Sequence, residues 1–137
     1  MTKREMAKIC SKKKKNLLKQ WSSRGRELSP RCYLCGKTDH LQCHHAFSKK
    51  FFPALRYDIA NRIVVCPSCH TFKGKTELGS FHHSPLAVHK WIKDYYDDYV
   101  YCICNLHNEI TYDIDTLNDI ETCLITNTRY WDFITGE

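Results

Sequence analysis

Two cysteine pairs, CYLC at residues 32–35 and CPSC at residues 66–69, decide the fold of this chain. Two residues separate the cysteines of each pair, and this spacing lets one tight turn direct both thiolates at a single ion. Gly36 follows the first pair, where the backbone must bend back past the metal. The pairs predict a tetrahedral structural zinc site with four ligands: Cys32, Cys35, Cys66 and Cys69.

Disulfide, redox and purely structural roles fit the nine cysteines less well than zinc binding does. A disulfide scaffold requires a secreted chain, but the opening sequence MTKREMAKICSKKKK has neither the apolar segment nor the cleavage site of a signal peptide. A redox pair would normally occur once, in a βαβ unit, and core burial of two separate pairs would be a coincidence. We therefore expect a cytoplasmic protein that binds zinc. No apolar run reaches the roughly 18 residues of a membrane span, so we expect no membrane partner.

Charge is unevenly distributed along the 137 residues. Residues 1–50 contain 14 Lys and Arg against 3 Asp and Glu, whereas residues 94–137 contain 1 against 10. A basic N-terminal part suits a polyanionic partner, and an acidic C-terminal part keeps the opposite face away from it. The length fits one compact unit with appendages.

The sequence predicts an α+β fold in three parts. Residues 1–30 are expected to form a basic N-terminal helix, over residues 3–20, followed by a linker that leads into the first cysteine pair. Residues 31–80 are expected to form the core, with strands at LQCHHAF and NRIVVC and a short helix that begins at Pro67.

The third part, residues 81–137, is predicted to be a small α/β extension packed on the core. Its first element is an amphipathic helix expected over residues 84–99. A hairpin that turns at His107 and Asn108 should follow, because apolar and polar residues alternate on both sides of that pair. A short helix is expected over residues 116–123.

Between the cysteine pairs lies a set of polar residues with a pattern of its own. His44 and His45 are adjacent on a predicted strand, Asn61 precedes the second strand, and His70 directly follows the second pair. Neighbouring strand residues point to opposite faces, so we expect different tasks for the two adjacent histidines. This constellation within four cysteines resembles the HNH endonucleases, which have a ββα-metal fold. The resemblance covers about residues 31–75, and LQCHHAFSKK with ALRYDIANRIVVCPSCH is similar to phage-encoded members, including recombination nucleases of the NinG type.

The resemblance implies a role for each of these residues. His45 is implied to be the general base that deprotonates the attacking water, and Asn61 to orient its ring by a hydrogen bond. His44 and His70 are implied to hold one divalent ion at the scissile phosphate, which would give 5′-phosphate and 3′-hydroxyl ends. The family most often has Asp where this chain has His44, and two imidazole ligands leave Mg²⁺, Mn²⁺, Zn²⁺ and Ni²⁺ open. We expect Mg²⁺ first and Mn²⁺ second.

Basic residues around this constellation are candidates for DNA contacts. They fall into a set near the histidines and a run in the N-terminal helix: Lys49, Lys50, Arg56, Arg62, Lys73 and Lys75, and Lys12, Lys13, Lys14 and Lys15. A solvated surface position explains any one of them equally well. The lysine run could also be a solubilising tail.

Two further sets of residues each fit two roles. His82 or His83 could supply a third metal ligand or contact the substrate, but GSFHHSP also fits an ordinary loop before a helix. Cys102 and Cys104, predicted to share one face of a strand, could belong to a second zinc site. Burial of reduced cysteines in the core explains them more simply.

These patterns together predict a metal-dependent HNH DNA endonuclease that nicks DNA or cuts branched DNA, with structural Zn²⁺ and catalytic Mg²⁺ or Mn²⁺. A single ββα site cuts one strand per event, so a double-strand break needs a homodimer or two encounters. The alternative is a non-catalytic, zinc-stabilised nucleic-acid-binding module in which structural contacts occupy the histidines. The sequence leaves the preferred form of the substrate open.

Overall fold

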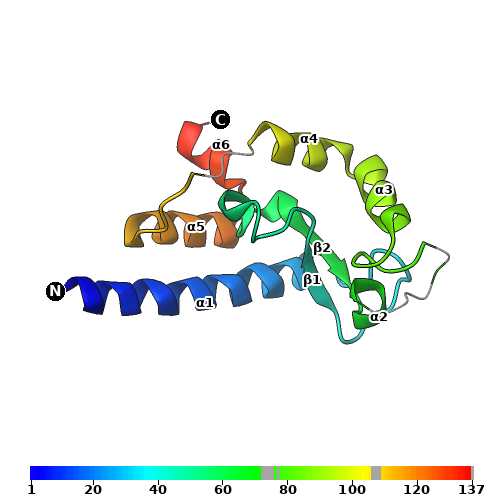
Figure 1. Ribbon diagram of the computed structural model, residues 1–137, viewed down its shortest axis with the longest axis horizontal. Coiled ribbons are helices and arrows are strands. Elements are labelled where there is room, and N and C mark those ends of the chain that lie inside the picture. Colours follow the sequence, from blue (N-terminus) through cyan, green and yellow to red (C-terminus); the bar gives the residue numbers. More distant parts are fainter. Residues whose placement is uncertain (72–75, 77, 106–108, 137) are drawn as a thin grey trace.

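The computed structural model describes residues 1–71, 76, 78–105 and 109–136. In chain order its elements are α1 (Lys3–Leu28), β1 (Gln42–His45), the 3-10 turns η1 (Pro53–Leu55) and η2 (Ile59–Asn61), β2 (Arg62–Val65), α2 (Pro67–His70), α3 (Pro85–Asp94), α4 (Tyr96–Cys104), α5 (Ile114–Thr126) and α6 (Tyr130–Thr135) (Figure 1). The fold is α+β and rich in helix, and the described strands form one two-stranded sheet. Within the described ranges, no helix combines the length and the apolar character needed to cross a membrane.

Helix α1 is longer than the sequence predicts. Thr2 caps its N-terminus by accepting a hydrogen bond from the backbone N–H of Glu5, and the helix continues to Leu28, into the segment 22–30 that we expected to be a linker. It continues because its C-terminal part packs on the sheet. Gly25 is buried there, and a Cβ at this position would lie 2.5 Å from the Arg62 side chain. This tertiary contact outweighs the low helix propensity of glycine.

Strands β1 and β2 and helix α2 form the predicted ββα unit. The strands are antiparallel, with His44 opposite Ile63 and His45 opposite Arg62. Helix α2 begins at Pro67, whose fixed φ angle and missing N–H suit a first helical position. The unit brings the end of β1 and the end of α2 into contact, so residues that are far apart in the sequence share one site.

Two apolar clusters hold the ββα unit and the flanking helices together. The first surrounds the cysteine pairs, where α3 contributes Ala87 and Trp91 to a cluster with Ile63 and Phe81. The second lies between α1 and α5, and its buried residues include Leu17, Trp21, Leu117, Ile120 and Leu124. Figure 1 shows α5 alongside α1, so the C-terminal extension packs on the N-terminal helix as well as on the core.

The acidic C-terminal part makes ion pairs within the protein. Glu121 on α5 lies 2.7 Å from Lys13 on α1 and also accepts a hydrogen bond from Gln20 at 3.1 Å. Asp98 on α4 pairs with Arg129 beside α6 at 2.5 Å. The pair of Lys13 with Glu121 therefore compensates part of the charge imbalance between the two ends of the chain.

The predicted hairpin is wrong in its first arm, because VYCIC ends helix α4. Alternating apolar residues fit a strand, but the same run also fits a helix with one buried position, and Cys102 occupies that position against η1 and η2. Cys104 is exposed, since residues two apart on a helix point in different directions. Cys102 and Cys104 therefore do not share one face of a strand, as a second zinc site there would require. The predicted turn at His107 and Asn108 lies outside the described residues.

Two of the predicted helices of the extension are found with changed boundaries. The helix expected over residues 84–99 is two helices, α3 and α4, which meet at Tyr95. The short helix expected over residues 116–123 is confirmed as part of α5. Asp113 is the N-cap of this helix and accepts a hydrogen bond from the backbone N–H of Thr116.

Candidate active site and zinc site

The four cysteines predicted to bind zinc converge in space. One Sγ atom from each of the four lies within 4.8 Å of the others, and Cys35 and Cys66 bring their sulfurs to 3.6 Å. A tetrahedral zinc site with Zn–S bonds of about 2.3 Å separates its sulfurs by about 3.8 Å. Three of the four residues are buried, and Gly36 adopts the left-handed φ of 79° that returns the chain past the first pair. This donor set fits a structural zinc ion.

Backbone groups prepare the first cysteine pair for a metal. Burial alone would raise the pKa of the Cys32 thiol, but hydrogen bonds from nearby backbone N–H groups, including that of Cys35, lower it to about 7. The pair is tied to the sheet because Tyr33 N–H donates to Val64 O at 2.8 Å. Cys32 therefore has thiolate character near neutral pH, whereas burial raises the pKa of Cys35, and the turn that carries both is anchored on β2.

Three histidines from three segments form a second cluster. His44 lies on β1, His70 ends α2, and His82 lies in the segment before α3; one ring nitrogen from each lies within 4.8 Å of the others. Their ring centroids are 4.7–5.1 Å apart. Backbone hydrogen bonds from Phe81 to Cys69 and from His82 to His70 hold the third segment against α2. Neutral imidazoles in this arrangement can hold one divalent transition-metal ion.

The surroundings keep the rings of His44 and His70 neutral. Burial, together with the neighbouring histidines, lowers the pKa of His44 to about 3. Burial and then His82 also lower the pKa of His70. The Nδ1 of His70 lies 2.9 Å from Gln42 Oε1, which accepts a hydrogen bond, so the opposite nitrogen keeps its lone pair for a ligand role. His44 and His70 are therefore in the protonation state that metal binding requires.

His45 has different surroundings from those of its neighbour. Its ring stacks on Trp21 of α1 with centroids 4.0 Å apart, whereas the ring of His44 stacks on Phe81. The two histidines therefore differ in their contacts, as expected for a strand. Because the carbonyl of Arg56 accepts a hydrogen bond from Nε2 at 2.9 Å, Nδ1 keeps a lone pair. Burial lowers the pKa of His45 to about 4, so the ring is neutral at pH 7.

Asn61 is fully buried and holds the loop between the strands. Its Nδ2 donates to the carbonyls of Phe47 and Leu55 at 3.0 Å each, and its Oδ1 accepts from Phe47 N–H at 2.6 Å. The expected bond from Asn61 to the His45 ring is replaced by the bond from His45 to Arg56. Since Arg56 directly follows Leu55, Asn61 fixes the backbone that in turn orients His45.

Comparison with protein families gives one result. Residues 32–76 match the family model of the HNH endonucleases. The central part of the chain is therefore an HNH domain, and the match spans both cysteine pairs, His44, His45, Asn61 and His70, whereas His82 lies beyond it. No match was found among curated proteins or among solved structures. The resemblance to phage-encoded, NinG-type members stays a prediction.

Basic residues of the HNH domain differ in their surroundings. Arg62 is half-buried and donates to the backbone carbonyl of Trp21 at 3.1 Å, so it ties α1 to β2. Arg56 lies over the ring of Tyr57 at 5.4 Å. Lys49 and Lys50 are exposed. Two further predicted contact residues, Lys73 and Lys75, lie outside the described residues.

The lysine run of α1 is divided between two sides of the helix. Lys13 pairs with Glu121 at 2.7 Å, and Lys14 lies 5.9 Å from the centre of the Tyr112 ring. Both therefore belong to the contact between α1 and the C-terminal extension. Lys12 and Lys15 are exposed.

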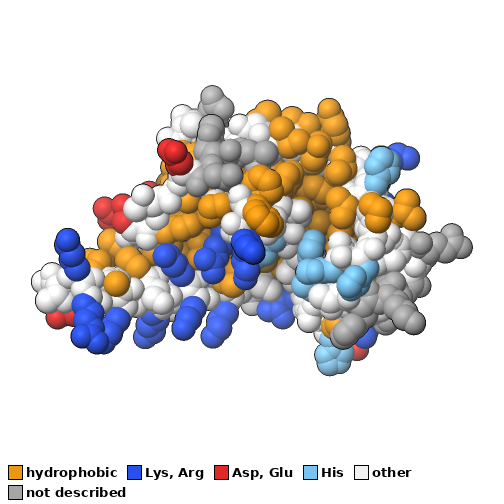
Figure 2. Space-filling model, in the orientation of Figure 1, with side chains coloured by type: hydrophobic (Ala, Val, Ile, Leu, Met, Phe, Trp, Pro, Cys, Tyr) orange, Lys and Arg blue, Asp and Glu red, His pale blue; other side chains and the backbone are white. Residues whose placement is uncertain are grey.

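An open groove of about 1090 Å³ joins α1 to the HNH domain. Its walls include Lys15, Lys19 and Arg26 from α1, and its lining also contains all four histidines of the site: His44, His45, His70 and His82. Figure 2 shows Lys and Arg side chains along α1 and histidines gathered on the same face of the molecule. A polyanion in this groove would contact the basic helix and the histidines together.

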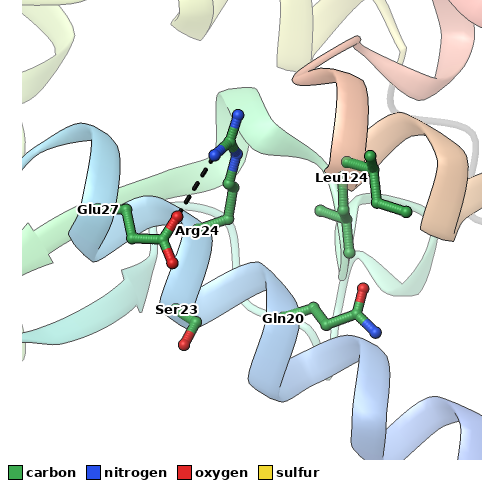
Figure 3. A pocket seen from close by; sticks show the side chains of 6 residues that line it. Gln20, Ser23, Arg24, Glu27 and Leu124 are labelled. Carbon is green, nitrogen blue, oxygen red and sulfur yellow. Dashed lines mark hydrogen bonds and ion pairs between the residues drawn. The ribbon is translucent and has the colours of Figure 1, made fainter.

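A smaller hollow of about 260 Å³ lies between α1 and α5 (Figure 3). Its lining includes Gln20, Leu124 and the ion pair of Arg24 with Glu27, whose atoms are 3.3 Å apart. This hollow is largely apolar and belongs to the packing of the two helices.

Sequence reasoning left His82 undecided and missed Trp21. The pair His82-His83 was visible in the sequence, but only the backbone pairing with α2 selects His82 for the cluster. Trp21 lies outside the matched segment, four residues after Leu17, and this helical spacing predicts burial without indicating a partner.

Proposed function

We propose that the protein is a metal-dependent nuclease that hydrolyses phosphodiester bonds in DNA, with His45 as general base. The HNH domain indicates a nuclease. The finer proposal rests on the different positions of the histidines. The ring nitrogens of three of them converge, whereas His45 lies separately in the same groove, and within the described residues its hydrogen bond through Nε2 leaves Nδ1 with a lone pair.

The proposed reaction assigns a task to each group. His44, His70 and His82 would hold the divalent ion, which supplies charge neutralisation at the scissile phosphate and at the leaving oxygen. His45 takes the proton of the attacking water on Nδ1, and the Arg56 carbonyl stabilises the charge that the ring acquires. Asn61 keeps that carbonyl in place through Leu55. The expected products are 5′-phosphate and 3′-hydroxyl ends.

The ligand set favours Mn²⁺ over Mg²⁺ within the expected pair of catalytic ions. Imidazole suits transition metals, whereas Mg²⁺ prefers carboxylate, carbonyl and water oxygens. Among the described residues, the histidine cluster includes no carboxylate. We therefore expect Mn²⁺ to support greater activity than Mg²⁺ at equal concentration.

A plasmid-nicking assay tests the general base. Wild-type protein, His45→Ala and His83→Ala are each incubated with supercoiled plasmid and Mn²⁺ or Mg²⁺. His83 is exposed and outside the cluster, so its variant controls for the loss of an imidazole next to the site. We expect His45→Ala to lose roughly 100- to 10,000-fold in rate while its zinc content and Mn²⁺ binding stay unchanged.

Two results would contradict the proposal in different ways. Equal nicking by His45→Ala and wild type would refute the general-base role. Binding of DNA without any cleavage, with either metal and with duplex, flap and junction substrates, would favour the zinc-stabilised binding module. The same substrate panel distinguishes nicking from branch cutting, and a homodimer that cuts both strands stays a prediction.

A further inference from the structure

Helix α1 carries basic side chains along one side. Lys8, Lys12, Lys15, Lys19 and Arg26 follow one another at intervals of 4, 3, 4 and 7 residues, which keep side chains on one face of an α-helix. All five are exposed, and Figure 2 shows Lys and Arg side chains in a row along α1. The last three of these residues line the groove that contains the histidines. We call the five residues the basic line.

The charges of the basic line are available to a partner. Among the described residues, no carboxylate oxygen lies within ion-pair distance of Lys15 or Lys19, and the groove lining contains neither Asp nor Glu. The Arg26 side chain donates to two uncharged groups, the carbonyl of Ser22 and the hydroxyl of Ser23. The lysines that do have partners, Lys13 and Lys14, are turned toward α5 and Tyr112.

We propose that the basic line binds the phosphate backbone of duplex DNA beside the cleavage site and guides the cleaved strand into the histidine groove. This inference rests on the proposed nuclease function, because the histidine site defines where the cleaved phosphate lies. The line spans 18 residues from Lys8 to Arg26, or about 27 Å of helix. That length corresponds to about 8 base pairs of DNA.

The groove favours a duplex over an unpaired strand. Proteins that bind single strands without sequence preference commonly stack the bases on exposed aromatic rings. The aromatic rings in the described groove lining other than the histidines are Trp21 and Phe81, which are 1% and 6% exposed. Trp21 already stacks on His45. Phosphate contacts from lysine and arginine are therefore the available interactions, and these suit an intact duplex backbone.

A binding experiment with matched charge tests the proposal. The triple variant Lys15→Gln, Lys19→Gln and Arg26→Gln is compared with a control triple, Lys3→Gln, Arg31→Gln and Lys93→Gln, which removes three exposed charges away from the groove. Both sets are made in the His45→Ala background, so that duplex DNA is bound without being cut. Affinity is measured over a range of salt concentrations.

The expected loss is large for the groove triple alone. The loss of three phosphate contacts should make the decrease of log affinity with log salt concentration shallower by about 2.7. At 0.1 M salt, duplex binding should be weaker on the order of 100-fold. Shortening the duplex on one side of the cleavage site from about 12 to about 4 base pairs should lower the DNA affinity of the control triple. It should have little effect on the affinity of the groove triple. Equal losses in both triples, or a loss confined to single-stranded DNA, would overturn the proposal.

A small substrate separates this proposal from the proposed function. Bis(p-nitrophenyl) phosphate is much shorter than the basic line, so with His45 restored the groove triple should lose far less activity on this substrate than on duplex DNA. Hydrolysis by both proteins with unchanged duplex affinity would refute the basic line and leave the nuclease intact. Loss of duplex affinity in the groove triple, with no hydrolysis of any substrate by wild type, would refute the nuclease and leave the basic line as a DNA-binding surface.

Discussion

Replacement of Gly25 by alanine tests how closely α1 must approach the HNH domain. An added Cβ would lie 2.5 Å from Cδ and 2.7 Å from Nε of Arg62, and 2.8 Å from Sγ of Cys43. Neither neighbour moves freely, because Arg62 donates to Trp21 O at 3.1 Å and the Cys43 thiol donates to Ser22 O at 3.2 Å. The methyl group must therefore displace α1 or break these contacts.

Two opposing effects set the size of the change. Alanine in a helix interior is favoured over glycine by up to about 1 kcal/mol. Overpacking of a tight contact costs about 1–3 kcal/mol. All three contacts of the added Cβ are shorter than 3.0 Å, so the upper part of this range applies, about 2–3 kcal/mol. We expect Gly25→Ala to lose a net of about 1–2 kcal/mol, or roughly 3–8 °C in melting temperature. Activity should fall as well, because displacement of α1 moves Trp21 away from the ring of His45.

Thermal unfolding and plasmid nicking of Gly25→Ala measure both effects. Ser11→Ala is the control, since this exposed position on the same helix also gains helix propensity and lies outside the groove lining. A second variant, Gly25→Ala with Arg62→Ala, removes the two nearest atoms and should show a smaller cost than the two single changes added together. An increase in melting temperature for Gly25→Ala alone would refute the packing argument.

Three further predictions concern the buried carboxylate, the zinc site and the histidine cluster. Burial raises the pKa of Asp58 to about 6, so the folded protein binds an extra proton and the contribution of this group to stability is lost as pH rises from about 4 to about 6. Asp58→Asn should remove this loss of stability, which amounts to roughly 3 kcal/mol between pH 4 and pH 7. Urea unfolding at the two pH values measures the free energy of unfolding of wild type and Asp58→Asn, and an equal change with pH in both proteins would contradict the prediction. Cys66→Ser should release zinc and abolish cooperative unfolding of the central region, as measured by metal analysis and calorimetry; a melt identical to wild type would argue against a structural zinc ion. His82→Ala should weaken Mn²⁺ binding roughly tenfold or more by titration calorimetry, and unchanged affinity would remove His82 from the ligand set.

The sequence by itself was sufficient for the local features of the HNH domain. The zinc cysteines are recognisable because each pair supplies its two ligands from one short turn, so their spacing alone carries the geometry. The two strands and α2 follow from β-branched residues and from Pro67, which act within a few residues of chain. Adjacent histidines on a strand must differ in their contacts, and this too is local.

Only the tertiary structure decided which distant residues complete the site. His82 joins His44 and His70 because backbone hydrogen bonds bring its segment against α2, and no local pattern distinguishes it from His83. Trp21 reaches His45 because Gly25 lets α1 approach the sheet. The same docking turns some lysines of α1 toward α5 and others toward the groove. Local periodicity determines that a face is apolar or charged, but the partner of that face depends on how the whole chain packs.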